Sequence, residues 1–142
     1  MKKNLITNTY EIVNWPKLPS HMESDLLNYS KSCSYKDNIH HRTSKVSPDQ
    51  YDQIQFLWFS PPDYLLDWIK ENISLDDGYK TVIQVWRYSK KFKNYANRHK
   101  DRGRKFSFNY LLEPHLGITR WFEDDGTLID EVNYKPSVWY KH

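Results

Sequence analysis

The spacing of apolar and polar residues divides the chain into a front part with helical periodicity and a back part with strand periodicity. Up to about residue 78, Ser20 and Glu23 form an S-x-x-E capping box ahead of one amphipathic segment, and residues 60–63 (SPPD) open a second one. The apolar stripe of the second segment consists of Leu65, Trp68, Ile69 and Ile73. We therefore predict two helices in the front half.

Alternation of apolar and polar residues with a period of two is typical of β-strands, and it dominates the back part of the chain. A shorter alternating segment lies at 9–15, and residues 51–59 are strand-like and become more apolar toward their end. Asp124-Asp125-Gly126 predicts a two-residue hairpin loop. The strands expected in the back part are YKTVIQVWRYS (79–89), KFSFNYLLE (105–113), ITRWFE (118–123), TLIDEVNY (127–134) and SVWYKH (137–142).

These patterns predict a single α+β domain over residues 1–142, with a helical front at about 1–78 and a β core at about 79–142. We expect a mainly antiparallel sheet, closed into a barrel or stacked as a sandwich, with the two helices packed on it. The residues expected to include core positions are Leu65, Trp68, Ile69, Phe106, Phe108 and Tyr110.

Composition narrows the class of protein. Aromatic residues make up 16% of a chain that has only 4 Gly, and flat side chains pack well on a pleated sheet. The 1 Cys, Cys33, excludes an intrachain disulfide and fits a reducing compartment, so we expect a cytoplasmic protein. We expect neither a signal peptide nor a membrane-spanning helix, because no apolar run of sufficient length is present.

Positive charge is concentrated in one segment. Of the chain's 21 Lys and Arg residues, nine lie between Arg87 and Lys105 beside a single acid, so the rest of the chain is net acidic. Tyr88, Phe92 and Tyr95 interleave with these cations, and bases stack on aromatic rings while cations neutralise phosphates. The segment therefore predicts an anionic partner such as nucleic acid, unless it is simply a solvated loop.

His99 and Asp101 are the strongest candidates for metal chemistry. Residues two apart on a strand project to the same side, so an imidazole and a carboxylate at this spacing can reach one ion. With a third ligand they would form the facial arrangement that holds iron(II) and leaves three positions open. The alternative is a surface histidine beside an acid in a basic loop.

The order of these features resembles the 2-oxoglutarate/iron(II)-dependent oxygenase superfamily, especially its small prolyl- and aspartyl-hydroxylase-like members in bacteria and phages. The resemblance covers roughly residues 79–139. It rests on the strand 79–89, His99-x-Asp101, the basic residues that follow, the strand FSFNYLLE with Asn109, and ITRWFE with Trp121. It implies a double-stranded β-helix of the jelly-roll or cupin type, supported by the two N-terminal helices.

The resemblance also implies cofactors and site residues. Iron(II) and 2-oxoglutarate are the cofactors, and the metal ligands are His99, Asp101 and, as the third, His142. Asn109 lies on the strand that lines the pocket. Arg120 could substitute for the basic residue that anchors the far carboxylate of 2-oxoglutarate if its strand turns it toward the pocket, and the sequence leaves that parity open. The family pattern places further residues after a strand like SVWY, which implies a truncated or degenerate relative with an incomplete β-helix. We also expect His142 to fray.

Two further interpretations stay open beside the oxygenase. One is a non-catalytic β-rich binding domain that uses the basic loop 87–105 for nucleic acid or another anionic partner. In the other, open sheet edges pair with a second copy of the chain and give a homo-oligomer. The substrate of the oxygenase, a small molecule or a peptide, is not readable from the residues, and no membrane partner is expected.

Overall fold

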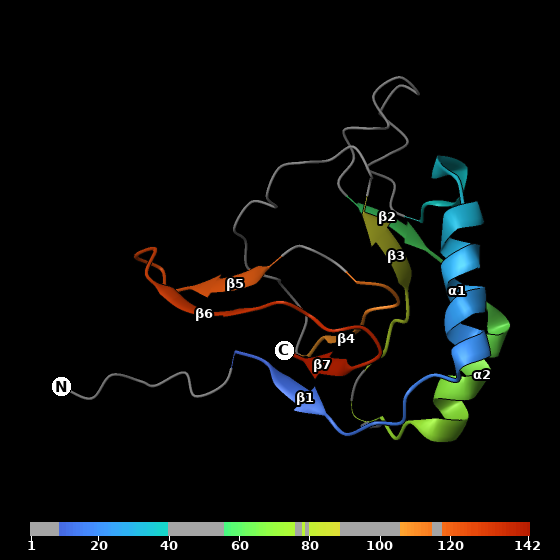
Figure 1. Ribbon diagram of the computed structural model, residues 1–142, viewed down its shortest axis with the longest axis horizontal. Helices are drawn as coiled ribbons and strands as arrows, with labels where there is room; N and C mark the ends of the chain where they lie inside the picture. The colour runs from blue at the N-terminus through green and yellow to red at the C-terminus, as the bar shows by residue number, and fades with distance from the viewer. Residues whose placement is uncertain (1–8, 40–55, 76–77, 79, 89–105, 115–117) are drawn as a thin grey trace. The chain divides into compact units, whose positions relative to one another are not determined.

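The computed structural model describes residues 9–39, 56–75, 78, 80–88, 106–114 and 118–142, and Figure 1 traces them in colour. The chain forms two compact units. One, called here the helical unit, comprises Ser20–Lys100, and the other, the β unit, combines Met1–Pro19 with Asp101–His142. The N-terminal residues therefore group with the C-terminal strands, whereas we had placed them with the helical front.

The helical unit contains both predicted helices and two strands. Its strands β2 and β3 pair antiparallel, with Leu57 opposite Arg87. We expected β3 to begin near residue 80 and to belong to the β core, but it begins at Val85 and pairs with β2. In chain order, the elements are α1 (Ser20–Ser32), the short 3₁₀ helix η1 (Tyr35–Asp37), β2 (Phe56–Phe59), α2 (Asp63–Asn72) and β3 (Val85–Tyr88).

The core of the helical unit gathers on one side of each element. Phe59 and Leu57 on β2 are almost completely buried, at 0% and 1% exposure. The expected stripe of α2 is confirmed at three of its positions, since Leu65, Ile69 and Ile73 are buried, whereas Trp68 is only half-buried. The other buried apolar side chains of this unit are Met22, Leu26, Cys33 and Val85.

Arg87 on β3 closes the C-terminal end of α1. Its guanidinium donates hydrogen bonds to the carbonyl oxygens of Ser30 and Cys33, the latter over 2.8 Å, and lies 5.2 Å from the centre of the Phe59 ring. The last carbonyls of a helix have no partner within the helix and carry partial negative charge, so a cation stabilises them. Arg87 therefore acts as the C-terminal cap of α1.

The β unit contains a sheet and a separate hairpin. In the sheet, β7 lies between β1 and β4 and runs antiparallel to both, while β5 and β6 form the hairpin (Figure 1). The structure thus confirms an α+β class with antiparallel sheets, and within the residues it describes no barrel is closed. The strands are β1 (Glu11–Val13), β4 (Phe108–Tyr110), β5 (Thr119–Phe122), β6 (Leu128–Val132) and β7 (Trp139–Lys141).

The core of the β unit is centred on β7 rather than on the expected strand 105–113. Trp139 and Tyr140 are buried, at 9% and 3% exposure. Phe108 and Tyr110 on β4 are half-buried, and Phe106 is exposed. The middle strand of the sheet is covered on both edges by its neighbours, which explains why β7 carries the most buried side chains.

The β5–β6 turn differs from the expected two-residue loop. Glu123 accepts a hydrogen bond from the amide of Gly126 over 2.9 Å and donates one to the carbonyl of Thr127 over 2.8 Å. Gly126 has a φ of 91°, a conformation that costs a residue with a Cβ about 1–2 kcal/mol. The loop is therefore of the three-residue kind, in which a turn is followed by a glycine in the left-handed region.

The helices in the described segments lack the length and the apolar character that a membrane span requires.

Candidate functional site

The two faces of the β1–β7–β4 sheet carry different side chains because consecutive residues of a strand point to opposite sides. On β7, Trp139 and Lys141 point to one side, which we call the Trp139 face. Tyr140 and His142 point to the other, which we call the His142 face. The register places Asn109 of β4 opposite Tyr140, so Asn109 shares the His142 face.

His142 is held by the backbone of the neighbouring strand. Its amide donates to the carbonyl of Ser107 over 2.9 Å, and its own carbonyl accepts from the amide of Ser107 over 2.8 Å. This pair continues the antiparallel ladder of β4 and β7 by one step. Two backbone hydrogen bonds thus tie His142 to the neighbouring strand, and the fraying that we expected there stays a prediction.

The imidazole of His142 is surrounded by polar and aromatic partners. Its Nε2 atom lies 2.7 Å from Nδ2 of Asn109 and 2.6 Å from the hydroxyl oxygen of Tyr134. The Tyr134 ring stacks on the imidazole at 5.8 Å and 15°, and the Trp121 ring meets it edge-on at 5.6 Å and 86°. Asn109, Trp121, Tyr134 and His142 are called the His142 cluster below.

The two residues just before β1 join the hairpin to this cluster. Tyr10 stacks on Trp121 with ring centres 5.6 Å apart and also meets Tyr140 at 6.1 Å. The hydroxyl of Thr9 donates to Oδ2 of Asp130, which faces Trp121 across the hairpin. These contacts place Trp121 against His142.

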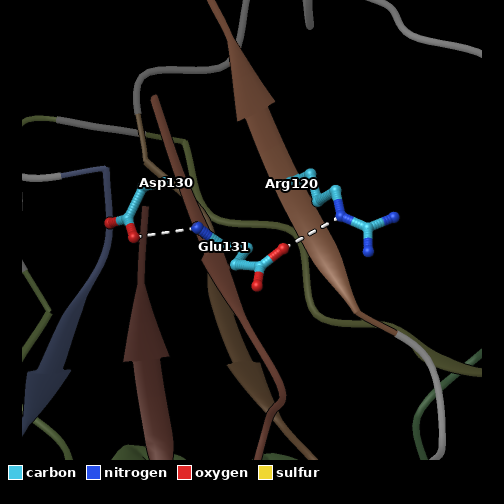
Figure 2. Close-up of polar contacts among 3 residues, drawn as sticks. All are labelled: Arg120, Asp130 and Glu131. Atoms are coloured by element: carbon cyan, nitrogen blue, oxygen red, sulfur yellow. Dashed lines mark hydrogen bonds and ion pairs between the residues drawn. The ribbon is translucent and has the colours of Figure 1, made fainter. Parts of the chain in front are cut away.

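Arg120 lies on the opposite side of the hairpin from Trp121. Its Nε donates to Oε2 of Glu131 over 3.0 Å, and both side chains are well exposed, at 38% and 50%. Figure 2 shows the Arg120 guanidinium and the Asp130 carboxylate on different sides of Glu131. Among the residues selected from the sequence, Asn109 and His142 are therefore brought together, and Arg120 does not join them.

An iron(II) site can be tested only in part against this geometry. His99 and Asp101 lie outside the described residues, so their expected convergence stays a prediction. In the part of the chain that the structure describes, no three His, Cys, Asp or Glu side chains gather as a metal site would require. Nε2 of His142 already has two close partners, so a metal at that nitrogen does not fit the arrangement.

Among the described residues, shifted pKa values occur at two tyrosines of the helical unit and at one aspartate of the hairpin. Burial raises the pKa of Tyr29, whose hydroxyl donates to the carbonyl of Ser60. Burial, with the nearby Asp25 carboxylate, also raises the pKa of Tyr64. In the hairpin turn, hydrogen bonds from the side chain and the backbone amide of Thr127 lower the pKa of Asp125.

Tyr134 is the member of the cluster that sequence reasoning missed. It closes the alternating segment TLIDEVNY, but it lies after the end of β6, and its hydroxyl contacts a histidine eight positions later. Thr9, Tyr10 and Asp130 were missed as well. Periodicity carried no signal for these contacts, because each joins segments whose pairing depends on the register of the strands.

Comparison of the chain with protein-family models, with curated proteins and with solved structures gives no match.

Proposed function

We propose that this protein is a 2-oxoglutarate- and iron(II)-dependent oxygenase of the hydroxylase type, or a degenerate relative of one. In this proposal the β unit is the core of a double-stranded β-helix, and His99 and Asp101 bind iron(II). The His142 face forms one wall of the reaction site, where it contacts a small-molecule or peptide substrate. The cofactors supply the oxidative chemistry, and the chain supplies ligands, orientation and exclusion of water.

The contact between Asn109 and His142 carries the proposal. The resemblance to the oxygenases selects both residues from segments 33 positions apart, and they lie 2.7 Å apart on one face of one sheet. Trp121, which the resemblance also uses, packs against the same imidazole. A pattern that picks out three residues meeting in space is more specific than the short motif His99-x-Asp101 alone.

The proposal is tested by binding of iron(II) and release of succinate. We expect iron(II) to bind weakly, because two protein ligands leave a hydrated ion with little geometric control. Succinate release in the presence of iron(II), ascorbate and 2-oxoglutarate should be slow but measurable, and it should be abolished in His99→Ala and Asp101→Ala. His21→Ala, which changes an exposed histidine on α1, serves as the matched control and should behave as the wild type.

Two results would contradict the oxygenase. One is succinate release that is unchanged in His99→Ala and Asp101→Ala. The other is the absence of both iron(II) binding and succinate release in the wild type, which would favour the non-catalytic binding domain. Fluorescence anisotropy with single-stranded DNA and RNA at low and high salt would then test the basic loop, because phosphate contacts weaken steeply as salt rises.

A further inference from the structure

We infer that His142 is not a metal ligand but a positioning residue, whose ring accepts hydrogen bonds at Nε2 and holds Asn109 and Tyr134 on the His142 face. His142 then has a different role from the third metal ligand that the resemblance implies. Only the metal-binding test of this role rests on the proposed function. The hydrogen bonds of the ring and its effect on folding are independent of whether His99 and Asp101 bind iron(II).

The partners of Nε2 determine which ring nitrogen of His142 carries the proton. Nδ2 of an asparagine amide can only donate a hydrogen bond, so Nε2 of His142, 2.7 Å away, must accept it. The hydroxyl of Tyr134, 2.6 Å from the same nitrogen, then donates to it as well, so the two donors share the single lone pair of Nε2. An imidazole that accepts at Nε2 carries its proton on Nδ1.

The tautomer of His142 also determines which ring nitrogen has a lone pair that could bind a metal. A histidine binds a metal through the lone pair of a ring nitrogen that carries no proton. In His142, Asn109 and Tyr134 share the single Nε2 lone pair, and Nδ1 holds the proton. A metal at either nitrogen would therefore require the ring to lose both hydrogen bonds or to change its tautomer.

The contacts around His142 also fix the orientation of its imidazole ring. The backbone of His142 is tied to Ser107 by two hydrogen bonds, the Tyr134 ring lies nearly parallel to the imidazole with ring centres 5.8 Å apart, and the Trp121 ring meets the imidazole edge-on. Rotation of the imidazole toward another partner would break the Tyr134 stack. The ring is thus fixed by its surroundings in the geometry in which Nε2 accepts.

Metal binding gives the first measurement. Co(II), as an air-stable substitute for iron(II), is titrated into the wild type, His142→Gln, His142→Ala and the control His21→Gln. We expect equal Co(II) affinity in all four proteins. A loss of at least about tenfold in both His142 variants, with His21→Gln unchanged, would overturn the inference, because ligands and their immediate partners have effects of that size.

The folding role gives the second measurement, by thermal unfolding without metal. His142→Ala removes the acceptor, whereas the side-chain oxygen of glutamine in His142→Gln can still accept near the position of Nε2. We expect a clear fall in Tm for His142→Ala and a substantially smaller fall for His142→Gln. Equal falls in the two variants, or no fall in either, would show that acceptance at this nitrogen does not hold the cluster.

The tautomer gives the third measurement, by long-range proton–nitrogen NMR of ¹⁵N-labelled histidine rings. We expect His142 to show an Nδ1-protonated ring whose Nε2 resonance shifts in Tyr134→Phe and does not move when diamagnetic Zn(II) is added to the metal-free protein at saturating concentration. An Nε2-protonated ring, or a Zn(II)-induced shift at either nitrogen, would overturn the inference. If the wild type binds neither metal, the proposed function fails, while the tautomer and the unfolding series still decide the role of His142.

Discussion

The two faces of the β1–β7–β4 sheet are built by the same three strands but are held together by different interactions. On the Trp139 face, the Trp139 ring lies 4.7 Å from Tyr110 and 5.4 Å from Trp15, and its Nε1 donates to the carbonyl of Pro16. On the His142 face, the contacts converge on the polar atom Nε2. One face packs apolar rings around Trp139, and the other combines the buried Tyr140 with a hydrogen-bonded cluster lined by aromatic rings.

Because the two faces differ in this way, substitutions on them should have different effects on the stability of the protein. Burial of large apolar surface contributes most to the free energy of folding, whereas a hydrogen bond contributes a small net amount but fixes a geometry. We therefore expect substitutions on the Trp139 face to change stability strongly. Substitutions on the His142 face should change stability modestly and the arrangement of polar groups more.

The largest effect is expected from Trp139→Ala. Removing a buried tryptophan leaves a cavity and an unused carbonyl at Pro16, and such changes cost about 3–5 kcal/mol in the free energy of unfolding. Urea unfolding followed by circular dichroism measures the change. Trp86→Ala, at a position that is 36% exposed, is the matched control and should cost clearly less. Equal losses of unfolding free energy in the two variants would show that burial does not set the cost of removing a tryptophan here.

A smaller loss is expected from Tyr134→Phe on the His142 face. The substitution keeps the ring stack on His142 and removes only the hydroxyl, so it should cost about 0.5–1.5 kcal/mol of unfolding free energy. Tyr64→Phe, at a tyrosine that is 39% exposed, is the control in the same unfolding assay. A loss as large as that of Trp139→Ala would mean that the His142 face is also a stability core.

Lys141 tests the rim of the Trp139 face. Its ammonium lies 3.5 Å from Oε1 of Glu11 and 4.2 Å from the centre of the Phe106 ring. Because the ion pair is partly exposed to solvent, Lys141→Met should lower the unfolding free energy by only about 0.2–1 kcal/mol at low salt. The difference from the wild type should shrink as salt is added, since screening weakens the pair. A difference that grows with salt would contradict this assignment.

The smallest effect is expected at Asp125, in the hairpin that carries Trp121 to the His142 face. Hydrogen bonds from Thr127 lower its pKa, so the ionised carboxylate is favoured in the folded state. This stabilisation is present above the ordinary pKa of an aspartate and is lost as pH falls through the lowered folded value. Asp125→Asn should therefore be slightly less stable than the wild type at neutral pH and should approach it in acid. Thermal unfolding over a pH series measures this, and a gap that widens in acid would contradict it.

The elements of the chain were more predictable than their partners. Both helices lie where the capping box and the SPPD segment predicted them, because these signals act within a few residues. Each strand of the β unit also falls inside an alternating segment. The pairing of β3 with β2 was not predictable, since periodicity says which face of a strand is apolar but not which strand lies beside it.

The candidate site was predictable in residue type but not in geometry. Asn109 and His142 were selected because their segments resemble the oxygenases, and the structure brings them into contact. That the contact uses Nε2, the atom a metal would need, depends on Tyr134 and on the register of β7 with β4. The side of the hairpin that Arg120 faces also depended on strand parity, which the sequence alone left open.

The capping of α1 by Arg87 changes how the charge of the basic segment should be counted. Nine Lys and Arg residues lie between Arg87 and Lys105, but the Arg87 guanidinium already donates to the carbonyls of Ser30 and Cys33. Binding of a polyanion releases condensed counterions in proportion to the phosphates that are neutralised, with a logarithmic salt slope of about 0.7–0.9 per phosphate. For this segment, the salt slope can report at most eight cations rather than nine. A contact between Arg87 and a phosphate would remove the C-terminal cap of α1.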